Sequence, residues 1–432
     1  MDSGLGPRRA ALGILLAVRG GTPFDAALER GLGGLPDADR RLAHELAAGV
    51  LRRGDALDAI IAPLLTRGIA HTDPSVLEIL RLGVYQLTEL ERVPAHAAVA
   101  TAVSLTRERV GERLTGVVNA VLRRVTRMAP EAKPAADSDL ASQHSHPAWL
   151  VDRWLARFGS DATTALLEWN NAHPMLVVQP TDGDLASLAS RFATAGVRSF
   201  PAPYDAGLIV EETRPERLPG FGEGAFYVQD PAQALVVRFA GVPAGATVFD
   251  ACAAPGGKTL GLATAAGLVI AGELSRRRIP RLRENLSRSG VVNVRVVYAD
   301  ALHPPIRPTD LVLLDAPCLG TGTFARHPDA RLRVRPEALA RLAREQTQLL
   351  DAAADRVRPG GVLCYATCSL EPEENAEQID RFLARHPEFR RAPIADVDVP
   401  MTAKGDLEIL PQRDAMDGAF AARLARHSAT EG

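Results

Sequence analysis

The sequence predicts an α/β protein in which a doubly wound, mostly parallel sheet follows an all-α segment and a small α+β module. Apolar residues recur at intervals of three and four over the first 128 residues, as they do on amphipathic helices. After Gly241, short apolar runs alternate with helical stretches, which is typical of a parallel sheet covered on both faces. The 432 residues suffice for about three domains, because one domain takes roughly 150 residues.

The composition is that of a folded globular protein. Hydrophobic residues make up 46% of the chain and charged residues 24%, which excludes a disordered or fibrous chain. The apolar run from Ala10 to Val18 is shorter than the roughly 20 residues that span a bilayer, so we expect a cytoplasmic protein without a membrane partner. Four cysteines in this length are too few for a secreted disulfide framework.

Residues 1–128 are predicted to form an all-helical domain. Asp73-Pro74 supplies a helix cap followed by a proline in the first turn, and further helices are expected at 95–109 and 112–127. Residues 129–147 change to Ala, Pro, Asp and Ser without periodicity, which predicts a linker. His144 and His146 lie in this stretch, and we expect both at the surface.

Arginine is strongly preferred over lysine, since only three of the 50 basic residues are lysines. A GC-rich genome would produce this bias through its codons. Contact with nucleic acid would also favour it, because guanidinium groups match phosphates and stack on bases. The net charge of −2 does not decide between the two explanations.

Residues 148–240 are predicted to form the small α+β module, and residues 241–432 the α/β domain. The module combines helices at 148–158 and 161–170 with short apolar runs. In the α/β domain we expect five strands, at Val248-Phe249, Leu268-Val269-Ile270, Val294 to Val297, Leu311 to Leu314 and Val362 to Tyr365. Ligands of such sheets bind beyond the carboxyl ends of the strands, so the residues that follow each strand are the candidates for chemistry.

A glycine-rich turn follows the first of these strands, in Asp250-Ala-Cys-Ala-Ala-Pro-Gly-Gly-Lys-Thr259. Gly256 and Gly257 allow a ligand close to the backbone at the start of a helix. The ending Gly-Lys-Thr resembles a P-loop, but Cys252 stands where that motif needs its first glycine, and Pro255 has no N–H to offer a phosphate. A P-loop nucleoside triphosphatase therefore remains only a minor alternative.

Two carboxylates are predicted at the ends of the next strands. Glu273 would lie where nucleotide-binding sheets contact ribose hydroxyls, and Asp300 where a carboxylate can accept from an adenine amino group. Together with the glycine-rich turn they outline an adenosine site. S-adenosyl-L-methionine fits this site better than ATP, because little in it is suited to a triphosphate.

Cys318 and Cys368 each follow a strand, in Asp315-Ala-Pro-Cys318 and Ala366-Thr-Cys368. A single cysteine there would most simply be a packing residue, but two at one edge indicate function. A zinc site on Cys364 and Cys368 is disfavoured, because residues at this spacing on a strand are about 13 Å apart. We therefore expect no metal, and we expect Cys364 in the core and Cys252 as a small packing residue.

Two thiols beside a methyl donor suit methylation of a pyrimidine at C5. The C5 atom is a poor nucleophile until a thiolate adds to C6, and the second thiol can assist the later release. Asp315 could accept a hydrogen bond from a cytosine amino group. The spacing alone does not say which thiol attacks.

Several motifs resemble those of the Sun/Nop family of RNA cytosine-C5 methyltransferases. They are the turn at 250–259, Asp315-Ala-Pro-Cys-Leu-Gly-Thr-Gly322, Arg326-His-Pro-Asp329, and Tyr365-Ala-Thr-Cys-Ser369 with Glu373-Glu-Asn375. Val117-Val-Asn-Ala-Val-Leu-Arg-Arg124 and its surroundings resemble the NusB-like RNA-binding domain of the bacterial RsmB (Fmu/Sun) branch. The resemblance covers nearly the whole chain.

The resemblance implies a Rossmann-like S-adenosyl-L-methionine-dependent core, an RRM-like middle module and small-subunit (16S) ribosomal RNA as substrate, and we expect a monomer. It makes Cys368 the nucleophile, Cys318 the residue that assists product release and Asp315 a base contact. The implied cofactor contacts are Cys252, Ala253, Ala254, Pro255, Gly256, Gly257, Lys258, Glu273, Asp300 and Asp315.

Three positions depart from the family pattern. Leu176-Val-Val-Gln-Pro180 lacks the usual arginine and asparagine, Glu273 replaces the commoner aspartate, and Ala419 replaces an aromatic residue in Asp417-Gly-Ala-Phe420. These changes bear on substrate placement more than on the reaction. A non-catalytic RNA-binding assembly factor that retains the fold is the alternative function.

Overall fold

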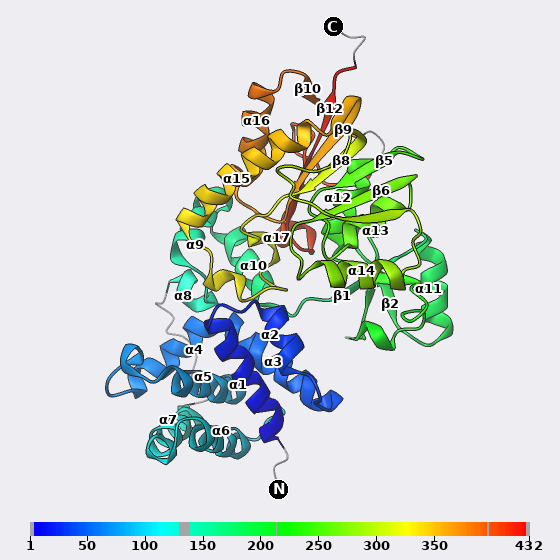
Figure 1. Ribbon diagram of the computed structural model, residues 1–432. Helices are drawn as coiled ribbons and strands as arrows, with labels where there is room; N and C mark the ends of the chain where they lie inside the picture. The colour runs from blue at the N-terminus through cyan, green and yellow to red at the C-terminus, as the bar shows by residue number, and fades with distance from the viewer. Residues whose placement is uncertain (1–3, 129–138, 213, 395–396, 429–432) are drawn as a thin grey trace. The chain divides into compact units, whose positions relative to one another are not determined.

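The computed structural model describes residues 4–128, 139–212, 214–394 and 397–428 (Figure 1). The chain forms two compact units. Unit 1 consists of Met1–Ala172 with Phe324–Arg333, and unit 2 of His173–Thr323 with Val334–Gly432. Residues 148–172, which the sequence groups with the middle module, thus pack in unit 1, and the expected domain boundaries stay a prediction.

Unit 1 is all-helical, as the sequence predicts. The side chain of Asp73 accepts hydrogen bonds from the N–H groups of Ser75 and Val76, which is the expected helix cap. The helices are α1 (Leu5–Arg19), α2 (Phe24–Gly31), α3 (Asp37–Arg52), α4 (Gly54–Ile61), α5 (Pro74–Thr88), α6 (Ala95–Arg109), α7 (Thr115–Met128), α8 (Leu140–His144), α9 (Ala148–Phe158) and α10 (Ser160–Asn171). Short 3-10 turns lie between some of them.

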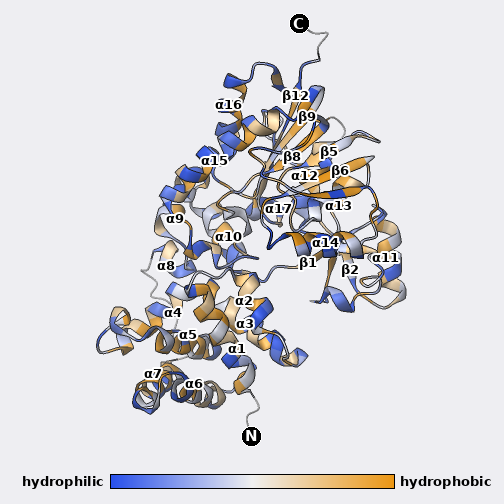
Figure 2. Ribbon diagram, viewed as in Figure 1, coloured by the Kyte–Doolittle hydropathy of each residue, from blue (hydrophilic) through white to orange (hydrophobic). Residues whose placement is uncertain are grey.

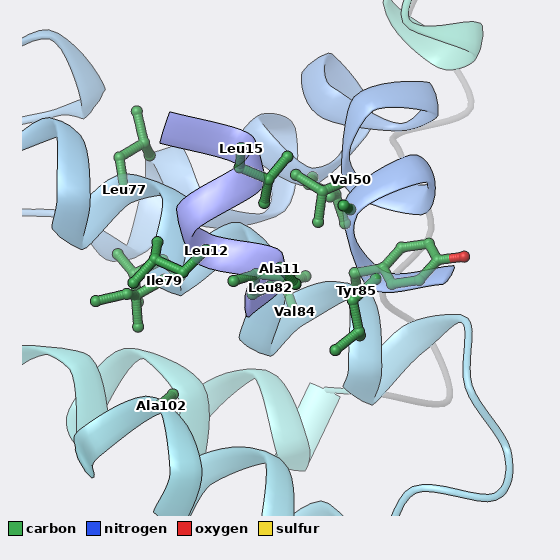
Figure 3. Packing of buried hydrophobic residues seen from close by; sticks show 14 of the residues in the cluster. Ala11, Leu12, Leu15, Val50, Leu77, Ile79, Leu82, Val84, Tyr85 and Ala102 are labelled. Atoms are coloured by element: carbon green, nitrogen blue, oxygen red, sulfur yellow. The ribbon is translucent and has the colours of Figure 1, made fainter. Parts of the chain in front are cut away.

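The core of unit 1 forms around α5, which is buried over most of its length. Figure 3 shows Leu15 of α1 beside Val50 of α3, and both belong to the same buried cluster as Leu12 of α1 and Tyr85 of α5. Each such side chain contributes about 1.5–3 kcal/mol when it is fully buried. Figure 2 shows that these helices carry hydrophobic and hydrophilic residues side by side, as amphipathic helices do.

The prediction that His146 lies at the surface is wrong. Its side chain is only 2% exposed, and its ring lies 6.0 Å from the rings of both Trp154 and Phe324. Its Nδ1 lies 2.7 Å from the carbonyl oxygen of His144, and its Nε2 lies 3.2 Å from the side-chain amide nitrogen of Asn170. Burial holds the pKa of His146 well below its usual value, so the ring is neutral. Of the predicted linker, residues 129–138 lie outside the described residues.

The segment Phe324–Arg333 explains part of this burial, because it packs inside unit 1 although it follows the predicted cysteine turn. Arg331 is buried, and its guanidinium donates to the carbonyl groups of Arg52 (3.1 Å) and Asn170 (2.9 Å) and to the side-chain oxygen of Asn171 (2.8 Å). Burial lowers the pKa of Arg331 to about 9. Asp329 accepts a hydrogen bond from the N–H of Phe24. The Arg326-His-Pro-Asp329 motif therefore lies in the helical unit.

Unit 2 contains a small antiparallel sheet in the order β2-β3-β1-β4. Its strands are β1 (Leu176–Pro180), β2 (Ser199–Pro201), β3 (Leu208–Val210) and β4 (Phe226–Val228), and α11 (Leu185–Thr194) packs on them. Val178, Phe192 and Phe226 form its core. Gln179, in the stretch that departs from the family pattern, is buried and donates to the carbonyl oxygen of Ala206 (2.9 Å).

The larger sheet of unit 2 has the order β10-β12-β9-β8-β5-β6-β7, with β11 paired to β12. All five predicted strands are present and parallel: β5 (Thr247–Asp250), β6 (Leu268–Glu273), β7 (Val294–Tyr298), β8 (Thr309–Asp315) and β9 (Val357–Thr367). The antiparallel edge consists of β10 (Phe389–Arg391), β11 (Leu407–Ile409) and β12 (Ala419–Arg426).

Helices cover both faces of this sheet, and its central strands β5 and β8 are accordingly buried over most of their length. Val248 and Leu313 pack with α12 (Pro231–Ala240) and α13 (Gly257–Ala263). Phe249 and Leu314 point to the opposite face, against α15 (Pro336–Ala354) and α16 (Ala376–Arg385). The remaining helices are α14 (Ile279–Arg288) and α17 (Pro411–Asp414). In the described part of the chain no helix is long and apolar enough to cross a membrane.

Packing of α3 against α5 predicts that Gly49 cannot carry a side chain. A Cβ atom at Gly49 would lie 2.0 Å from Cζ of Tyr85, which is buried and donates to Glu45. We expect Gly49→Ala to destabilise the protein by about 1–3 kcal/mol, measured by denaturant unfolding followed by circular dichroism. The control is Gly13→Ala in α1, where no atom lies within 4 Å and a gain of up to about 1 kcal/mol is expected. Equal stability of the two variants would contradict this packing.

Candidate functional site

The candidate site lies at the carboxyl ends of β5, β8 and β9, which are neighbours in the sheet. β8 and β9 are in register there, because Asp315 pairs with Ala366. Cys318 follows three residues after Asp315, and Cys368 two residues after Ala366. The structure brings the two Sγ atoms to 3.4 Å from each other.

The environment of the sulfurs makes them unequal. The hydrogen bond with Cys368, followed by burial, raises the pKa of Cys318 well above its usual value. Cys318 therefore keeps its proton, and either sulfur can be the donor in the contact between them. The arrangement can hold one sulfur as an acceptor and the other as its hydrogen-bond donor.

An ion pair lies beside the sulfurs. Nζ of Lys258, from the first turn of α13, is 2.7 Å from Oδ2 of Asp315 at the end of β8. Burial would lower the pKa of Lys258, but the charge and hydrogen bond of Asp315 and the nearby Cys368 raise it above its usual value. Lys258 is therefore a cation, and a thiolate at Cys368 would lie in its field.

The glycine-rich turn has little room for side chains. Gly256 has a φ of +107°, which side chains rarely tolerate, and a Cβ there would lie 2.8 Å from Leu282. A Cβ at Gly257 would lie 2.9 Å from Nε2 of Gln229. Ala253 and Ala254 are buried, while the carbonyl oxygen of Pro255 accepts from Asn285 (2.9 Å).

Asp250 at the end of β5 was not among the predicted site residues, although it begins the glycine-rich motif. It is almost completely buried, and its Oδ2 accepts from the hydroxyl of Thr259 at 2.6 Å. Burial raises the pKa of Asp250 to about 7, and the bond from Thr259 only partly opposes this. The hydrogen bond from Thr259 to Asp250 therefore joins the end of β5 to α13, the helix that carries Lys258.

The two predicted carboxylates lie on neighbouring strands. Glu273 is buried and accepts from the N–H groups of Ser275 (2.7 Å) and Ala254 (3.3 Å), so it also holds the glycine-rich turn. Asp300 follows β7, is 42% exposed at its side chain, and accepts from the N–H of Leu302 (3.0 Å). Leu274, directly after Glu273, is exposed.

These residues fit the nucleoside part of S-adenosyl-L-methionine. Two carboxylates can accept from hydroxyl and amino groups, and Leu274 offers an apolar contact. Lys258, the lysine of the turn that resembles a P-loop, forms its ion pair with Asp315.

Of the other two cysteines, Cys252 lies in the glycine-rich turn after β5 and Cys364 lies within β9. Cys364 is fully buried in the core, as expected, and burial raises the pKa of both Cys364 and Cys252 to about 12. Among the described residues, no group of three or more histidine, cysteine, aspartate or glutamate side chains has an arrangement that could hold a metal ion.

Sequence reasoning missed Glu374, Asn375 and Gln346, which surround the two cysteine turns. Glu374 is fully buried, and burial raises its pKa to about 7. The only sequence signal was the Glu373-Glu-Asn375 motif, which carried the resemblance but had no assigned role.

A parallel sheet with this order, an antiparallel edge and a glycine-rich turn after β5 defines a Rossmann-like methyltransferase core. The family described as 16S rRNA methyltransferase RsmB/F matches residues 242–425. The NusB family matches residues 6–127, and the ferredoxin-like domain of RsmF/B-like methyltransferases matches residues 146–215.

Known proteins are similar to this chain over 90% or more of its length. The chain is 35% identical to the ribosomal RNA small subunit methyltransferase B of Pseudomonas putida, over 99% of this chain and 100% of that protein. It is also 35% identical to the protein of this name from Vibrio cholerae, over 90% of each chain. The crystal structure of PH0851 matches with a TM-score of 0.83 and 25% identity, over 98% of this chain and 99% of that one. The chain therefore belongs to the RsmB/F family of methyltransferases, and the resemblance noted in the sequence is confirmed.

The buried carboxyl of Asp250 predicts a pH dependence of stability. Its folded pKa of about 7 lies above the unfolded value of about 3.9. The folded state thus binds this proton more tightly, and the contribution to stability falls as the pH rises from about 4 to 7, by at most about 1.4 kcal/mol per pH unit.

Asp250→Asn removes this titration while keeping an acceptor for Thr259. Its free energy of unfolding should therefore rise relative to wild type between pH 5 and pH 8, measured by denaturant unfolding at each pH. Gly13→Ala, which changes no titratable group, is the control, and its curve should run parallel to that of wild type. Parallel curves for Asp250→Asn and wild type would show that this carboxyl is not desolvated.

Proposed function

We propose that the protein is an S-adenosyl-L-methionine-dependent methyltransferase that methylates C5 of a cytosine in small-subunit (16S) ribosomal RNA. The observation that carries the proposal is the contact of the two sulfurs, 3.4 Å apart, beside the Lys258–Asp315 pair. Membership of the family supports the RNA substrate, and an enzyme that modifies this RNA would act in the cytoplasm.

Cys368 is the nucleophile in this proposal. Its thiolate adds to C6 of the cytosine, which places electron density on C5, and C5 then takes the methyl group that S-adenosyl-L-methionine supplies. Asp315 accepts a hydrogen bond from the cytosine amino group and fixes the base edge. Lys258 provides positive charge near the attacking sulfur and near Asp315.

Cys318 assists the release. The hydrogen bond to Cys368 is the largest cause of its raised pKa, and that interaction ends once the sulfur of Cys368 is bonded to carbon. Cys318 can then lose its proton to water and accept the proton from C5. The electrons of the C5–H bond form the C5=C6 double bond as the sulfur of Cys368 leaves with its electron pair. Both thiol groups return to their starting states after Cys368 exchanges a proton with solvent.

The cytosine has to leave its stack to be reached by a thiolate on one side and a methyl donor on the other. The NusB-like helices and the ferredoxin-like module are the candidates for holding the surrounding RNA. Exposed arginines such as Arg124 and Arg127 on α7 can contact phosphates there.

A non-catalytic assembly factor is the second candidate, since the fold alone could bind RNA. The paired sulfurs weigh against it, because RNA binding does not require two thiols at one edge of the sheet. ATP hydrolysis is disfavoured, because Lys258 is paired with Asp315 and Pro255 interrupts the row of N–H groups that would hold phosphates.

The mechanism predicts different behaviour for the two cysteine variants. With unmethylated 16S RNA and S-adenosyl-L-methionine, Cys318→Ala should accumulate a protein–RNA adduct that survives denaturing electrophoresis, because release fails after attack. Cys368→Ala should form no adduct, because attack fails. The control is Cys364→Ala, at a core cysteine within β9, which should turn over without accumulating adduct. The reverse pattern would exchange the two roles, and product without any dependence on Cys368 would exclude covalent catalysis.

Cofactor binding can be tested separately from RNA. Glu273→Ala should weaken S-adenosyl-L-methionine binding about tenfold or more in isothermal titration calorimetry, because a hydrogen bond to a charged group contributes roughly 1.5–3 kcal/mol. Glu284→Ala, an exposed change on α14, should leave the affinity unchanged. Equal affinities for the two variants would remove Glu273 from the cofactor site.

A further inference from the structure

Two adjacent buried residues, Glu374 and Asn375, lie between the two cysteine turns. Glu374 ends a short 3-10 turn (Pro372–Glu374) after β9, and Asn375 precedes the first residue of α16. Both side chains are buried, although glutamate and asparagine are rarely found in a core. Their hydrogen bonds explain why they are there.

Glu374 holds the turn of Cys318. Its carboxylate accepts from the N–H of Leu319, with Oε1 at 3.1 Å, and from Nε2 of Gln346 at 2.9 Å. The same amide nitrogen of Gln346 donates to the carbonyl oxygen of Pro317 at 2.9 Å. The backbone on both sides of Cys318 is thus fixed by Glu374 and Gln346.

Asn375 holds the turn of Cys368 in the same way. Its Oδ1 accepts from the hydroxyl of Thr367 at 2.6 Å, and its Nδ2 donates to the carbonyl oxygen of Ser369 at 2.8 Å. These are the residues immediately before and after Cys368. One dipeptide therefore fixes the backbone around both cysteines.

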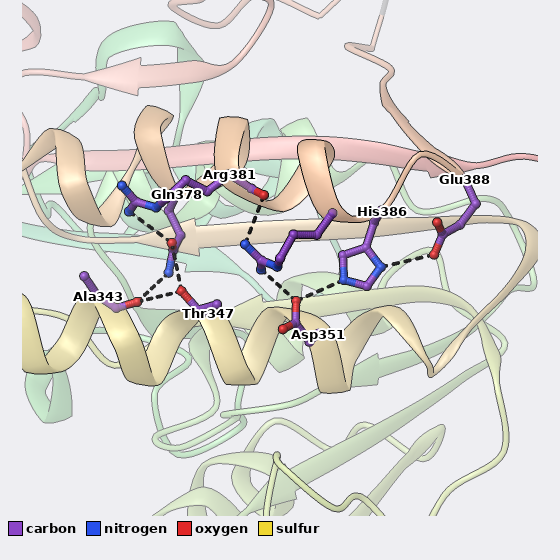
Figure 4. A network of polar contacts seen from close by, with 8 residues as sticks. Ala343, Thr347, Asp351, Gln378, Arg381, His386 and Glu388 are labelled. Carbon is purple, nitrogen blue, oxygen red and sulfur yellow. Dashed lines mark hydrogen bonds and ion pairs between the residues drawn. The ribbon is translucent and has the colours of Figure 1, made fainter.

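Gln346 lies on α15, and Glu374 and Asn375 directly precede α16, a helix that packs against α15. Figure 4 shows Gln378 of α16 joined to the carbonyl oxygen of Ala343 (2.7 Å) and to the hydroxyl of Thr347 (3.2 Å) on α15. Further along, Asp351 accepts from Arg385 (2.8 Å) and lies 3.0 Å from Nε2 of His386. Gln346 on α15 donates directly to Glu374 before α16 at 2.9 Å, so the two residues add a further bond between these neighbouring elements.

We infer that Glu374, with Gln346, and Asn375 are positioning residues that set the two catalytic sulfurs independently. Glu374 acts through the turn of Cys318, and Asn375 acts through the turn of Cys368. The inference rests on the proposed function, because it assigns the consequences of each displacement from the roles of the two thiols. A displacement of about 1 Å in a reacting group can slow a reaction about 100-fold.

The two supports should have opposite effects on the covalent intermediate. Loosening Cys318 slows release but not attack, so adduct accumulates although both cysteines are present. Loosening Cys368 slows attack, so the rate falls and no adduct accumulates. A residue that merely stabilised the fold would lower both steps together and would not separate them.

The test uses the full-length protein with unmethylated 16S RNA and S-adenosyl-L-methionine. Gln346→Met and Glu374→Gln should form adduct at nearly the wild-type rate in a single turnover, but multiple turnover should fall about tenfold or more while adduct accumulates. Asn375→Ala and the isosteric Thr367→Val should reduce the single-turnover rate of adduct formation about tenfold or more, without accumulation.

Matched controls lie on the same helices. Gln348→Met is an exposed change on α15, and Glu377→Gln is an exposed change on α16, so both should behave as wild type. Affinity for S-adenosyl-L-methionine and the thermal midpoint verify that each variant is folded. If Glu374→Gln does not fold, the milder Gln346→Met tests the positioning of Cys318. Thr367→Val tests the positioning of Cys368.

Cys318→Ala is the reference variant that distinguishes a failure of the positioning role from a failure of the proposed function. If it accumulates adduct but Gln346→Met and Glu374→Gln do not, the positioning role of Glu374 is overturned while the proposed function stands. If Cys318→Ala itself forms no adduct, the proposed function fails first. Adduct accumulation in Asn375→Ala and Thr367→Val would overturn the independent assignment of the two supports.

Discussion

The register between β8 and β9 is the constraint on which the site depends. Parallel pairing of Asp315 with Ala366 places the two cysteine turns at the same level of the sheet. A shift by one residue would turn the side chains of one strand to the opposite face and separate the sulfurs. The register is itself held by burial, because Leu313 and Leu314 pack in different cores on the two faces of the sheet. The core packing and the chemistry are therefore set by the same contacts.

The polar residues of the site form pairs that limit the cost of burial. Lys258 and Asp315 neutralise each other at 2.7 Å, and Asp250 shares its buried position with the hydroxyl of Thr259. An isolated charge would be expensive in this setting, whereas a paired one is tolerated. Cys318 also stays neutral, because its hydrogen bond with Cys368, followed by burial, raises its pKa well above the usual value. One sulfur can thus be activated without charging the other.

Sequence periodicity was sufficient for the elements but not for the contacts between distant segments. The five parallel strands and the cap at Asp73 were predictable, because apolar runs and capping residues are local signals. His146 was placed wrongly because its partners come from α10 and from Phe324, far along the chain. The role of Glu374 was missed for the same reason, since its partners at 319 and 346 lie 55 and 28 residues away.

The segment Phe324–Arg333 means that unit 1 cannot be treated as a detachable RNA-binding module. Arg331 is buried there, and one of its acceptors is the carbonyl oxygen of Arg52. Removal of residues 1–128 would take this acceptor away and leave part of a buried guanidinium unsatisfied, which typically costs more than the hydrogen bond itself contributes. This segment begins only six residues after Cys318, so a truncated enzyme could lose activity through a disturbed cysteine turn. Loss of activity on truncation is therefore no evidence for RNA binding, whereas exposed arginines of α7 such as Arg124 can be replaced without touching this segment.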